Sequence, residues 1–206
     1  MHRQKLITDV VNLEWEMFTN VQDASGRADC QDDLRTFVVM RSSQFSAWAT
    51  DTIESYIEDL KGARADGVNL MTLKYARMME ITFPEEYAAI REALPSVEPE
   101  VLNMAALIAA VHVLWAQEIA ERYPKLSALG RPSDYDAAIL AGTERWAAQD
   151  NYLRSELLTY SKRTLELCLR DTVEAQAAGR NMGIEILEAT VTRYGYDSLD
   201  SAESSL

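Results

Sequence analysis

The chain has 206 residues, of which 48% are hydrophobic and 26% are charged, and its formal net charge is −13. This length suits one domain with a substantial core, and the composition is ordinary for a soluble globular protein. Nucleic acids and anionic membrane surfaces attract clustered Lys and Arg, so the acidic balance argues against both as partners.

The cysteines and the N-terminal segment bear on the compartment. Cys30 and Cys168 stand apart, without the CxxC or similar spacing of a metal site. No signal-peptide pattern is recognisable, so we expect reduced thiols in a cytoplasmic protein. The most apolar stretch, residues 104–115, is too short to span a bilayer and contains His112, so we expect a buried helix there.

Apolar residues recur at three- and four-residue steps along most of the chain, and no segment shows the alternation of a strand. We therefore predict an all-α fold, a single-domain bundle of about seven helices over residues 1–206. The predicted helices cover residues 3–20, 32–62, 69–80, 82–94, 98–122, 147–178 and 184–194. The second, fifth and sixth of these are the long ones.

Two segments lie outside these helices. Residues 129–136 are the one long irregular stretch, which is a surface loop or a lid, and a weak helix follows around Ala137. Residues 197–206 form a short acidic tail that we expect to be frayed.

Residues typical of helix N-termini precede several of the predicted helices. Asp29 or Asp32 can cap the second helix, Asn69 the third, and Asn181 the seventh. Pro84 stands in the first turn of the fourth, where its missing N–H does no harm.

The most unusual residue is Arg41, which lies inside the apolar stripe of the second helix, with Gln44 at the edge of that stripe. A guanidinium keeps its charge and is costly to bury unpaired. An acidic group from elsewhere in the chain, or from a ligand, should therefore meet it. Glu14 and Glu156 also border apolar faces, which makes both of them candidates.

Polar residues on apolar faces project into a bundle, where facing helices build ligand pockets. We expect Arg41 to bind a carboxylate or phosphate in bidentate fashion. A glutamate would act as acid or base, and a lysine or tyrosine as a second proton-transfer group or anion contact. The candidate catalytic residues are Glu14, Lys74, Tyr75, Glu156 and Tyr160, and the candidate substrate-binding residues are Arg41, Gln44, Trp48 and His112.

A purely structural interpretation stands beside this one. Arg41 paired with Glu14 or Glu156 would fix the register of the helices without any chemistry. A lone histidine such as His112 often bonds a backbone carbonyl, and Trp48 suits a core or its rim.

Cofactor and metal chemistry has no recognisable motif. A di-iron bundle needs Glu-x-x-His pairs, and His2 and His112 are the only histidines. Phosphate-binding, dinucleotide-binding and serine-hydrolase motifs are all missing. We therefore expect no cofactor and no metal ion.

Several stretches together resemble a bacterial family known as domain of unknown function 4125. They are residues 13–18 (LEWEMF), 30–32 (CQD), 37–48 (FVVMRSSQFSAW), 55–60 (SYIEDL), 69–79 (NLMTLKYARMM), 123–126 (YPKL), 152–161 (YLRSELLTYS) and 194–199 (YGYDSL). The resemblance covers almost the whole chain in order, and implies one compact, mostly helical, cytosolic bacterial domain. The family pattern has Glu where this chain has Leu73, and Gly where it has Ser155.

These features lead to two functional hypotheses. The first is a cofactor-independent enzyme of the lyase or isomerase type, which acts on a small anionic metabolite in a pocket between helices. The alternative is a non-catalytic helical module that binds a protein partner or a small-molecule signal. The sequence does not exclude a homo-oligomer in either case.

Overall fold

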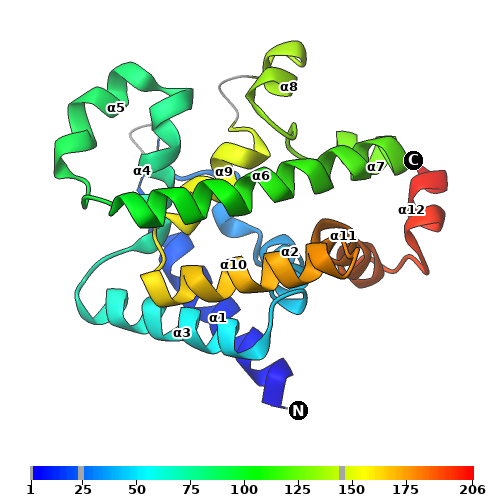
Figure 1. Cartoon of the computed structure of the whole chain (residues 1–206), viewed down its shortest axis with the longest axis horizontal. Helices are drawn as coiled ribbons and strands as arrows, with labels where there is room; N and C mark the ends of the chain where they lie inside the picture. Colours follow the sequence, from blue (N-terminus) through cyan, green and yellow to red (C-terminus); the bar gives the residue numbers. More distant parts are fainter. Residues whose placement is uncertain (1, 23–25, 144–146) are drawn as a thin grey trace.

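Helices account for all the regular structure in the computed structural model, which describes residues 2–22, 26–143 and 147–206 (Figure 1). The α-helices are α1 (His2–Thr19), α2 (Leu34–Ser46), α3 (Thr50–Ala65), α4 (Leu70–Thr82), α5 (Pro84–Ile90), α6 (Pro99–Arg122), α7 (Pro124–Ala128), α8 (Tyr135–Leu140), α9 (Gln149–Leu157), α10 (Lys162–Ala177), α11 (Met182–Arg193) and α12 (Leu199–Ser205). The 3-10 helices are η1 (Asp29–Asp32) and η2 (Arg91–Ala93). The predicted all-α class is confirmed for this part of the chain, whereas the predicted count of about seven helices is too low.

The predicted long second helix is wrong, because the chain turns a corner between α2 and α3. Arg3 Nη2 donates to the carbonyl of Ser46 at 2.9 Å, and so binds the end of α2. The N–H of Ala49 donates to Asp171 Oδ2 at 2.9 Å, and the Thr52 hydroxyl donates to the same oxygen at 2.7 Å. Arg3 and Asp171 therefore pair the Ser46 carbonyl and the Ala49 N–H, two backbone groups that a continuous helix would have paired internally. No Gly or Pro marks the corner, so its cause lies in tertiary contacts.

The predicted long sixth helix is also divided, into α9 and α10. Ser161 begins α10, and its hydroxyl accepts a hydrogen bond from the N–H of Thr164 at 3.2 Å. Its own N–H donates to Asp59 of α3 at 2.9 Å. The fifth predicted helix, in contrast, matches α6 closely.

The C-terminal segment is the third correction. The tail expected to fray contains α12, in which Leu199 and Ala202 are buried. Glu203 fastens this helix to α7 by accepting from the N–H groups of Lys125 and Leu126 at 2.9 and 2.8 Å. Carboxylates are favoured at a helix N-terminus, where N–H groups lack internal partners.

Three of the helix starts test the predicted caps. The side chains of Asn69 and Asn181 accept from backbone N–H groups at the start of α4 and α11, as predicted. For α2 the prediction of Asp29 or Asp32 is wrong, because Asp33 accepts from the N–H of Thr36 at 3.0 Å. The earlier aspartates belong to η1 instead.

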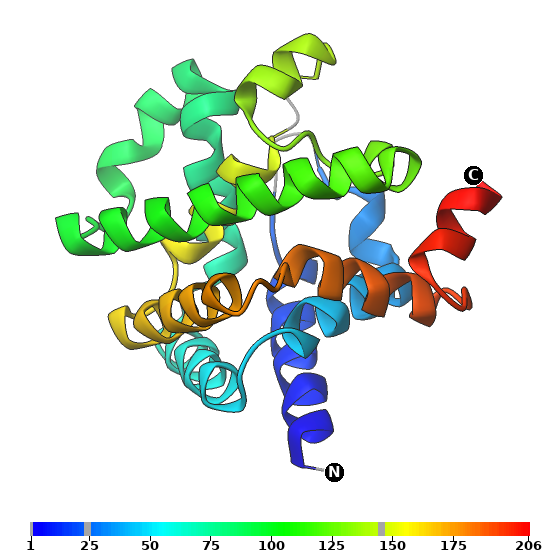
Figure 2. The same cartoon turned by 45° about the vertical axis from the view of Figure 1, so that its right-hand side comes forward.

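Eight helices pack into the body that holds the candidate site. Helix α1 packs against α2, α3 and α4, while α6 packs against α9, α10 and α11. Figures 1 and 2 show α6 and α10 side by side, with α5 and α8 projecting beyond them on one side. Contacts of α3 with α10 and of α4 with α9 join the two groups.

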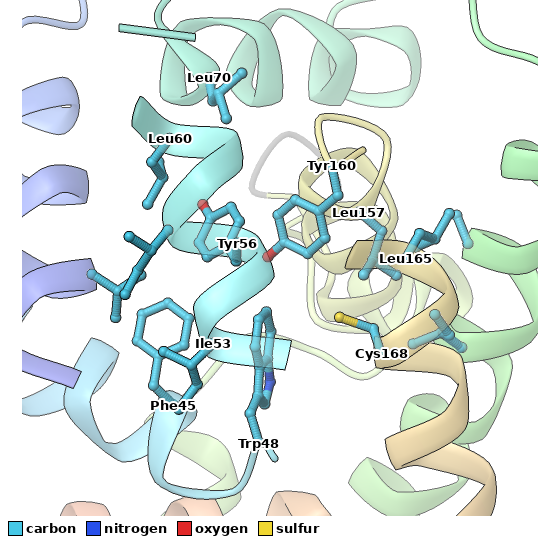
Figure 3. Packing of buried hydrophobic residues seen from close by; sticks show 14 of the residues in the cluster. Phe45, Trp48, Ile53, Tyr56, Leu60, Leu70, Leu157, Tyr160, Leu165 and Cys168 are labelled. Carbon is cyan, nitrogen blue, oxygen red and sulfur yellow. The ribbon is translucent and has the colours of Figure 1, made fainter. Parts of the chain in front are cut away.

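Aromatic side chains fill the centre of the core, and Figure 3 shows them converging from α3 and from the α2–α3 and α9–α10 junctions. The ring centres of Tyr56 and Tyr160 lie 4.5 Å apart. Trp48 stands edge-on to Phe45 at 5.1 Å and to Tyr160 at 6.0 Å. Pairs of this kind contribute about 0.5–1.5 kcal/mol each beyond their burial.

Among the helices described, α6 has the length and apolar composition that could cross a membrane. A core helix of a soluble protein meets the same criteria. Val101, Ala105, Ile108 and Trp115 are buried against the other helices, as expected for the centre of a bundle.

Candidate functional site

A cluster of buried charged side chains lies where α1, α2, α4 and α9 meet. Arg41 is its centre: Nε donates to Glu14 Oε2 at 2.5 Å, and Nη2 donates to Glu14 Oε1. The same Nη2 donates to Glu156 Oε1 at 2.8 Å. Two parallel bonds between a guanidinium and one carboxylate form the strongest and most directional type of ion pair.

Lys74 completes the ionic part of the cluster, with Nζ donating to Glu156 Oε2 at 2.5 Å. The two carboxylates and two cations balance in charge. The side chains of Glu14, Glu156 and Lys74 are at most 2% exposed, and that of Arg41 is 8% exposed. Isolated charges at such depth are unstable in a protein, so each depends on its partners.

Neutral side chains form further hydrogen bonds with the charged groups. Tyr56 donates to Glu14 Oε1 at 2.9 Å, and Tyr160 donates to Glu156 Oε1 at 2.7 Å. Arg41 Nη1 donates to the amide oxygen of Gln44 at 2.6 Å. We define the ion cluster as Glu14, Arg41, Gln44, Tyr56, Lys74, Glu156 and Tyr160.

Helical spacing explains why these side chains point inward. Glu14 follows buried Val10 and Val11 by four and three residues, so it shares their face of α1. Lys74 follows buried Leu70 and Met71 of α4 in the same way. Their apolar neighbours therefore carry both charged groups into the interior.

The surroundings separate the pKa values of the two glutamates. Burial raises the pKa of Glu14, and the nearby charge of Glu156 adds to this against the opposing pull of Arg41. Burial acts on Glu156 too, but the charges of Arg41 and Lys74 outweigh it and hold its pKa well below the usual range. Burial also raises the pKa of Tyr56 and Tyr160, so both hydroxyls stay protonated donors.

One cavity of about 260 Å³ opens beside the cluster, between η1, α2 and α4. Arg41, Lys74 and Arg131 line it, together with one carboxylate, Asp33. We call it the cationic cavity. Glu14 and Glu156, which balance two of these cations, do not line it. The cluster therefore turns its positive side toward this space.

Tyr152 forms a wall of the cationic cavity and lies between two of its cations. Lys74 Nζ is 3.4 Å from the centre of the Tyr152 ring, and the guanidinium carbon of Arg131 is 4.5 Å from it. Arg131 also donates to the carbonyl of Ala147 at 2.8 Å, which fixes the loop that carries it. This loop is the irregular stretch predicted as a surface loop or lid, and it contributes a residue to the cavity.

A second cavity of about 200 Å³ lies between α6, α9, α10 and α11. Its lining includes His112, Gln44, Trp48, Tyr152 and Glu156, and we call it the His112 cavity. Burial lowers the pKa of His112 to about 4, so the imidazole is neutral at physiological pH. Glu156 lines this cavity, Arg41 and Lys74 line the first, and Tyr152 lines both.

The structure brings most of the predicted site residues together. Glu14, Arg41, Gln44, Lys74, Glu156 and Tyr160 belong to the ion cluster. Trp48 packs on Tyr160, and Tyr75 lines the cationic cavity with its ring 6.0 Å from Lys74 Nζ. Burial raises the pKa of Tyr75, which keeps its hydroxyl protonated. His112 does not join Arg41 and lines the other cavity instead.

The sequence analysis missed three residues of the site. Tyr152 is four residues before Glu156 on α9, a spacing that places both on one face and could have identified it. Tyr56 lies in an apolar stripe and was indistinguishable from a core residue. Arg131 had no local signal, because it stands in an irregular stretch.

No metal site is found in residues 2–22, 26–143 and 147–206, since no three His, Cys, Asp or Glu side chains gather there to hold an ion. Three cations and one carboxylate of the described residues line the cationic cavity, a balance that suits an anion. The residues present therefore favour direct recognition of an anionic ligand by Arg, Lys and Tyr.

Comparison with known proteins yields one match. The model of a family described as "Protein of unknown function (DUF4125)" matches residues 4–204. This confirms the resemblance inferred from the sequence, over nearly its full length. No curated protein and no solved structure matches the chain.

Proposed function

The chain belongs to the DUF4125 family, and because that description names no activity, we propose a function from the site itself. The protein is a cofactor-independent enzyme of the lyase or isomerase type that acts on a small anionic metabolite in the cationic cavity. The observation that carries this proposal is the orientation of the ion cluster. Its cations face the cavity, while their carboxylate partners lie behind them.

Anion binding is assigned to Arg131, and Arg41 contributes its charge alone, because its five N–H groups already donate to Glu14, Gln44 and Glu156. Arg131 stands in the cavity wall against Tyr152, and Arg41 is held rigidly by Glu14 and Glu156. A site that is rigid before the ligand arrives loses little entropy on binding. A cavity of about 260 Å³ suits a metabolite with few heavy atoms.

Proton transfer is assigned to Lys74, with Tyr75 as a second donor. Lys74 would donate an Nζ proton to the oxygen on which charge develops as a C–H bond of the substrate breaks, and the resulting amine would accept the proton that the carbon releases. Glu156 holds the ammonium at 2.5 Å and stays ionised because its pKa is low. Tyr75 would donate its phenolic hydrogen to the same developing charge.

Binding is tested first, with phosphate, oxalate, malonate and succinate as probes in thermal unfolding and calorimetric titration. We expect at least one probe to bind, and Arg131→Met to weaken it. Arg193→Met, at the exposed end of α11, is the matched control and should leave binding unchanged. If no probe binds, or if both variants bind alike, the proposed site is wrong.

Catalysis is tested by deuterium incorporation from D2O into the C–H positions of malonate and succinate, followed by NMR. The parent should accelerate exchange, and Lys74→Met should abolish it. Exchange that persists in Lys74→Met would remove Lys74 from the mechanism.

A non-catalytic module is the second candidate. The internal pairing of every charge in the ion cluster favours it, since a purely structural cluster would look the same. A surface for a protein partner is available on α6, where Leu107 and Leu114 are each 58% exposed. Binding of a probe without any exchange would support this alternative.

A further inference from the structure

We propose that the His112 cavity is a second binding site, which takes a small uncharged molecule with a ring-sized apolar body and one hydrogen-bonding group. This inference does not rest on the proposed function, because it concerns a different cavity with different chemistry. Its evidence is the size and lining of the cavity, the state of His112, and the arrangement of charges around it.

Size and apolar lining define the body of the ligand. The cavity measures about 200 Å³, and apolar side chains from α6, α9 and α11 provide most of its wall, with Trp48 on one side. Dry cavities of roughly 150 Å³ lined by Leu, Ile and Phe bind benzene in other proteins. A molecule with one six-membered ring therefore fits this space.

His112 provides the hydrogen-bonding group. Within the described part of the chain no hydrogen bond to a ring nitrogen of His112 is found, and its ring lies edge-on to Trp115 with 4.8 Å between the ring centres. The carbonyl partner that the structural interpretation expected is therefore not found there. His112 is partly buried and lines the cavity, so a ligand there can supply the hydrogen-bond partner that the described residues do not.

The side chain of Gln149 also lines the cavity, and no hydrogen bond of its amide is found among residues 2–22, 26–143 and 147–206. Its amide can donate and accept, as can the neutral imidazole of His112. A hydroxyl or amide on the ligand would match either of them.

The charged side chains around the His112 cavity favour an uncharged ligand. Glu156 and Asp171 line the cavity, and no Lys or Arg among residues 2–22, 26–143 and 147–206 does, so an anion would meet two carboxylates. A cation gains little, because both carboxylates are already paired. Glu156 binds Arg41 and Lys74, while Asp171 binds Arg170 at 2.7 Å.

Three aromatic probes of equal ring size test these requirements. Phenol carries a hydroxyl, toluene carries no polar group, and benzoate carries a negative charge. We expect phenol to bind about two- to tenfold more tightly than toluene, the range that one neutral hydrogen bond provides. Benzoate should bind at least about tenfold more weakly than phenol, because each of the two carboxylates repels it.

The two histidines provide a site-specific readout. The ring signals of His112 should shift in a nitrogen–proton NMR spectrum when phenol is added. Those of His2, which is exposed on α1, should not move. Equal binding of phenol and benzoate, or shifts at neither histidine, would overturn the proposal.

Variants separate the cavity from the rest of the surface. Leu153→Trp should fill the cavity and weaken phenol binding at least about tenfold, while Leu107→Trp on the exposed face of α6 should not. His112→Leu combined with Gln149→Leu tests the hydrogen bond in case the larger residue disturbs folding, and should make phenol and toluene bind within about twofold of each other. Unchanged phenol binding in both cavity variants would contradict the assignment.

The proposals for the two cavities can be tested independently. Arg131→Met should leave phenol binding intact, since Arg131 does not line the His112 cavity. Loss of anion binding with intact phenol binding would overturn only the proposed function. The reverse result would overturn only the second site.

Discussion

The guanidinium of Arg41 and the carboxylate of Glu156 are hydrogen-bonded at 2.8 Å, although 115 positions separate them in sequence. This contact joins α2 to α9, and Lys74 extends it to α4 at 2.5 Å. A set of four mutually dependent charges therefore links elements from all three thirds of the chain.

Removal of Arg41 should be strongly destabilising, because it leaves two buried carboxylates short of a partner. We expect Arg41→Met to lower the free energy of unfolding by about 3–5 kcal/mol. Glu14→Met combined with Arg41→Met should recover much of this loss, because Glu156 keeps Lys74 and Tyr160. Urea denaturation measures both variants, with Arg35→Met on the exposed face of α2 as control. A double variant less stable than Arg41→Met would contradict the prediction.

Tyr160→Phe should remove one hydrogen bond to an ionised carboxylate and keep the packing of the ring. The expected loss is about 1.5–3 kcal/mol of unfolding free energy. Tyr194→Phe makes the same chemical change at a 43% exposed position and should have almost no effect. Equal stabilities of the two variants would show that Tyr160 contributes through its ring alone.

His112 should make stability depend on pH between about 6.5 and 4. Its folded pKa of about 4 lies below the ordinary value of 6.5, so the fold favours the neutral ring. This contribution is fully present above pH 6.5 and is lost as the pH falls toward 4, with a total of up to about 3 kcal/mol. Glu156 and Asp171 line the cavity with His112 in the parent and in His112→Leu alike, so the difference between the two proteins isolates the histidine. Parallel stability curves for the two would refute this prediction.

Cysteine labelling should distinguish the two thiols. Cys30 is exposed and lines the cationic cavity, whereas Cys168 is buried and burial raises its pKa well above the usual value. Iodoacetamide should therefore modify Cys30 in the native protein, and Cys168 only after unfolding. A ligand in the cationic cavity should slow the reaction of Cys30. Mass spectrometry of peptides identifies the labelled residue, and rapid native labelling of Cys168 would be the contrary result.

Asp171→Ala should destabilise the corner between α2 and α3. The variant loses the acceptor for the Ala49 N–H and for the Thr52 hydroxyl, at an expected total of about 2–4 kcal/mol. Glu174→Ala, on the exposed face of α10, is the matched control. Asp171→Asn keeps one oxygen acceptor and should be intermediate. Hydrogen exchange at the start of α3 should increase in Asp171→Ala, and unchanged protection there would argue against the role.

The sequence predicted the ion cluster well, because one unusual residue constrained the others. Arg41 on an apolar face required an acidic partner, and only a few carboxylates bordered apolar faces. Glu14 and Glu156 therefore emerged from periodicity and charge, before any distance was known.

Features set by tertiary contacts escaped the same reasoning. Arg3 and Asp171 divide the predicted second helix by binding its backbone groups, and the local sequence contains no Gly or Pro that would predict the break. Arg131 reaches the cationic cavity from an irregular loop, where no periodicity assigns a side chain to a face. Periodic patterns report which face is buried, and leave unspecified what distant residues bind there.

The corner between α2 and α3 also has a consequence for how the chain is made. Arg3, which binds the end of α2, leaves the ribosome early. Asp171, which binds Thr52, is 119 positions further along the chain and leaves it late. Until Asp171 emerges, the nascent polypeptide lacks the group that holds the start of α3. The ring of Trp48 also waits for its late partner Tyr160, and apolar surface that is uncovered during synthesis favours aggregation.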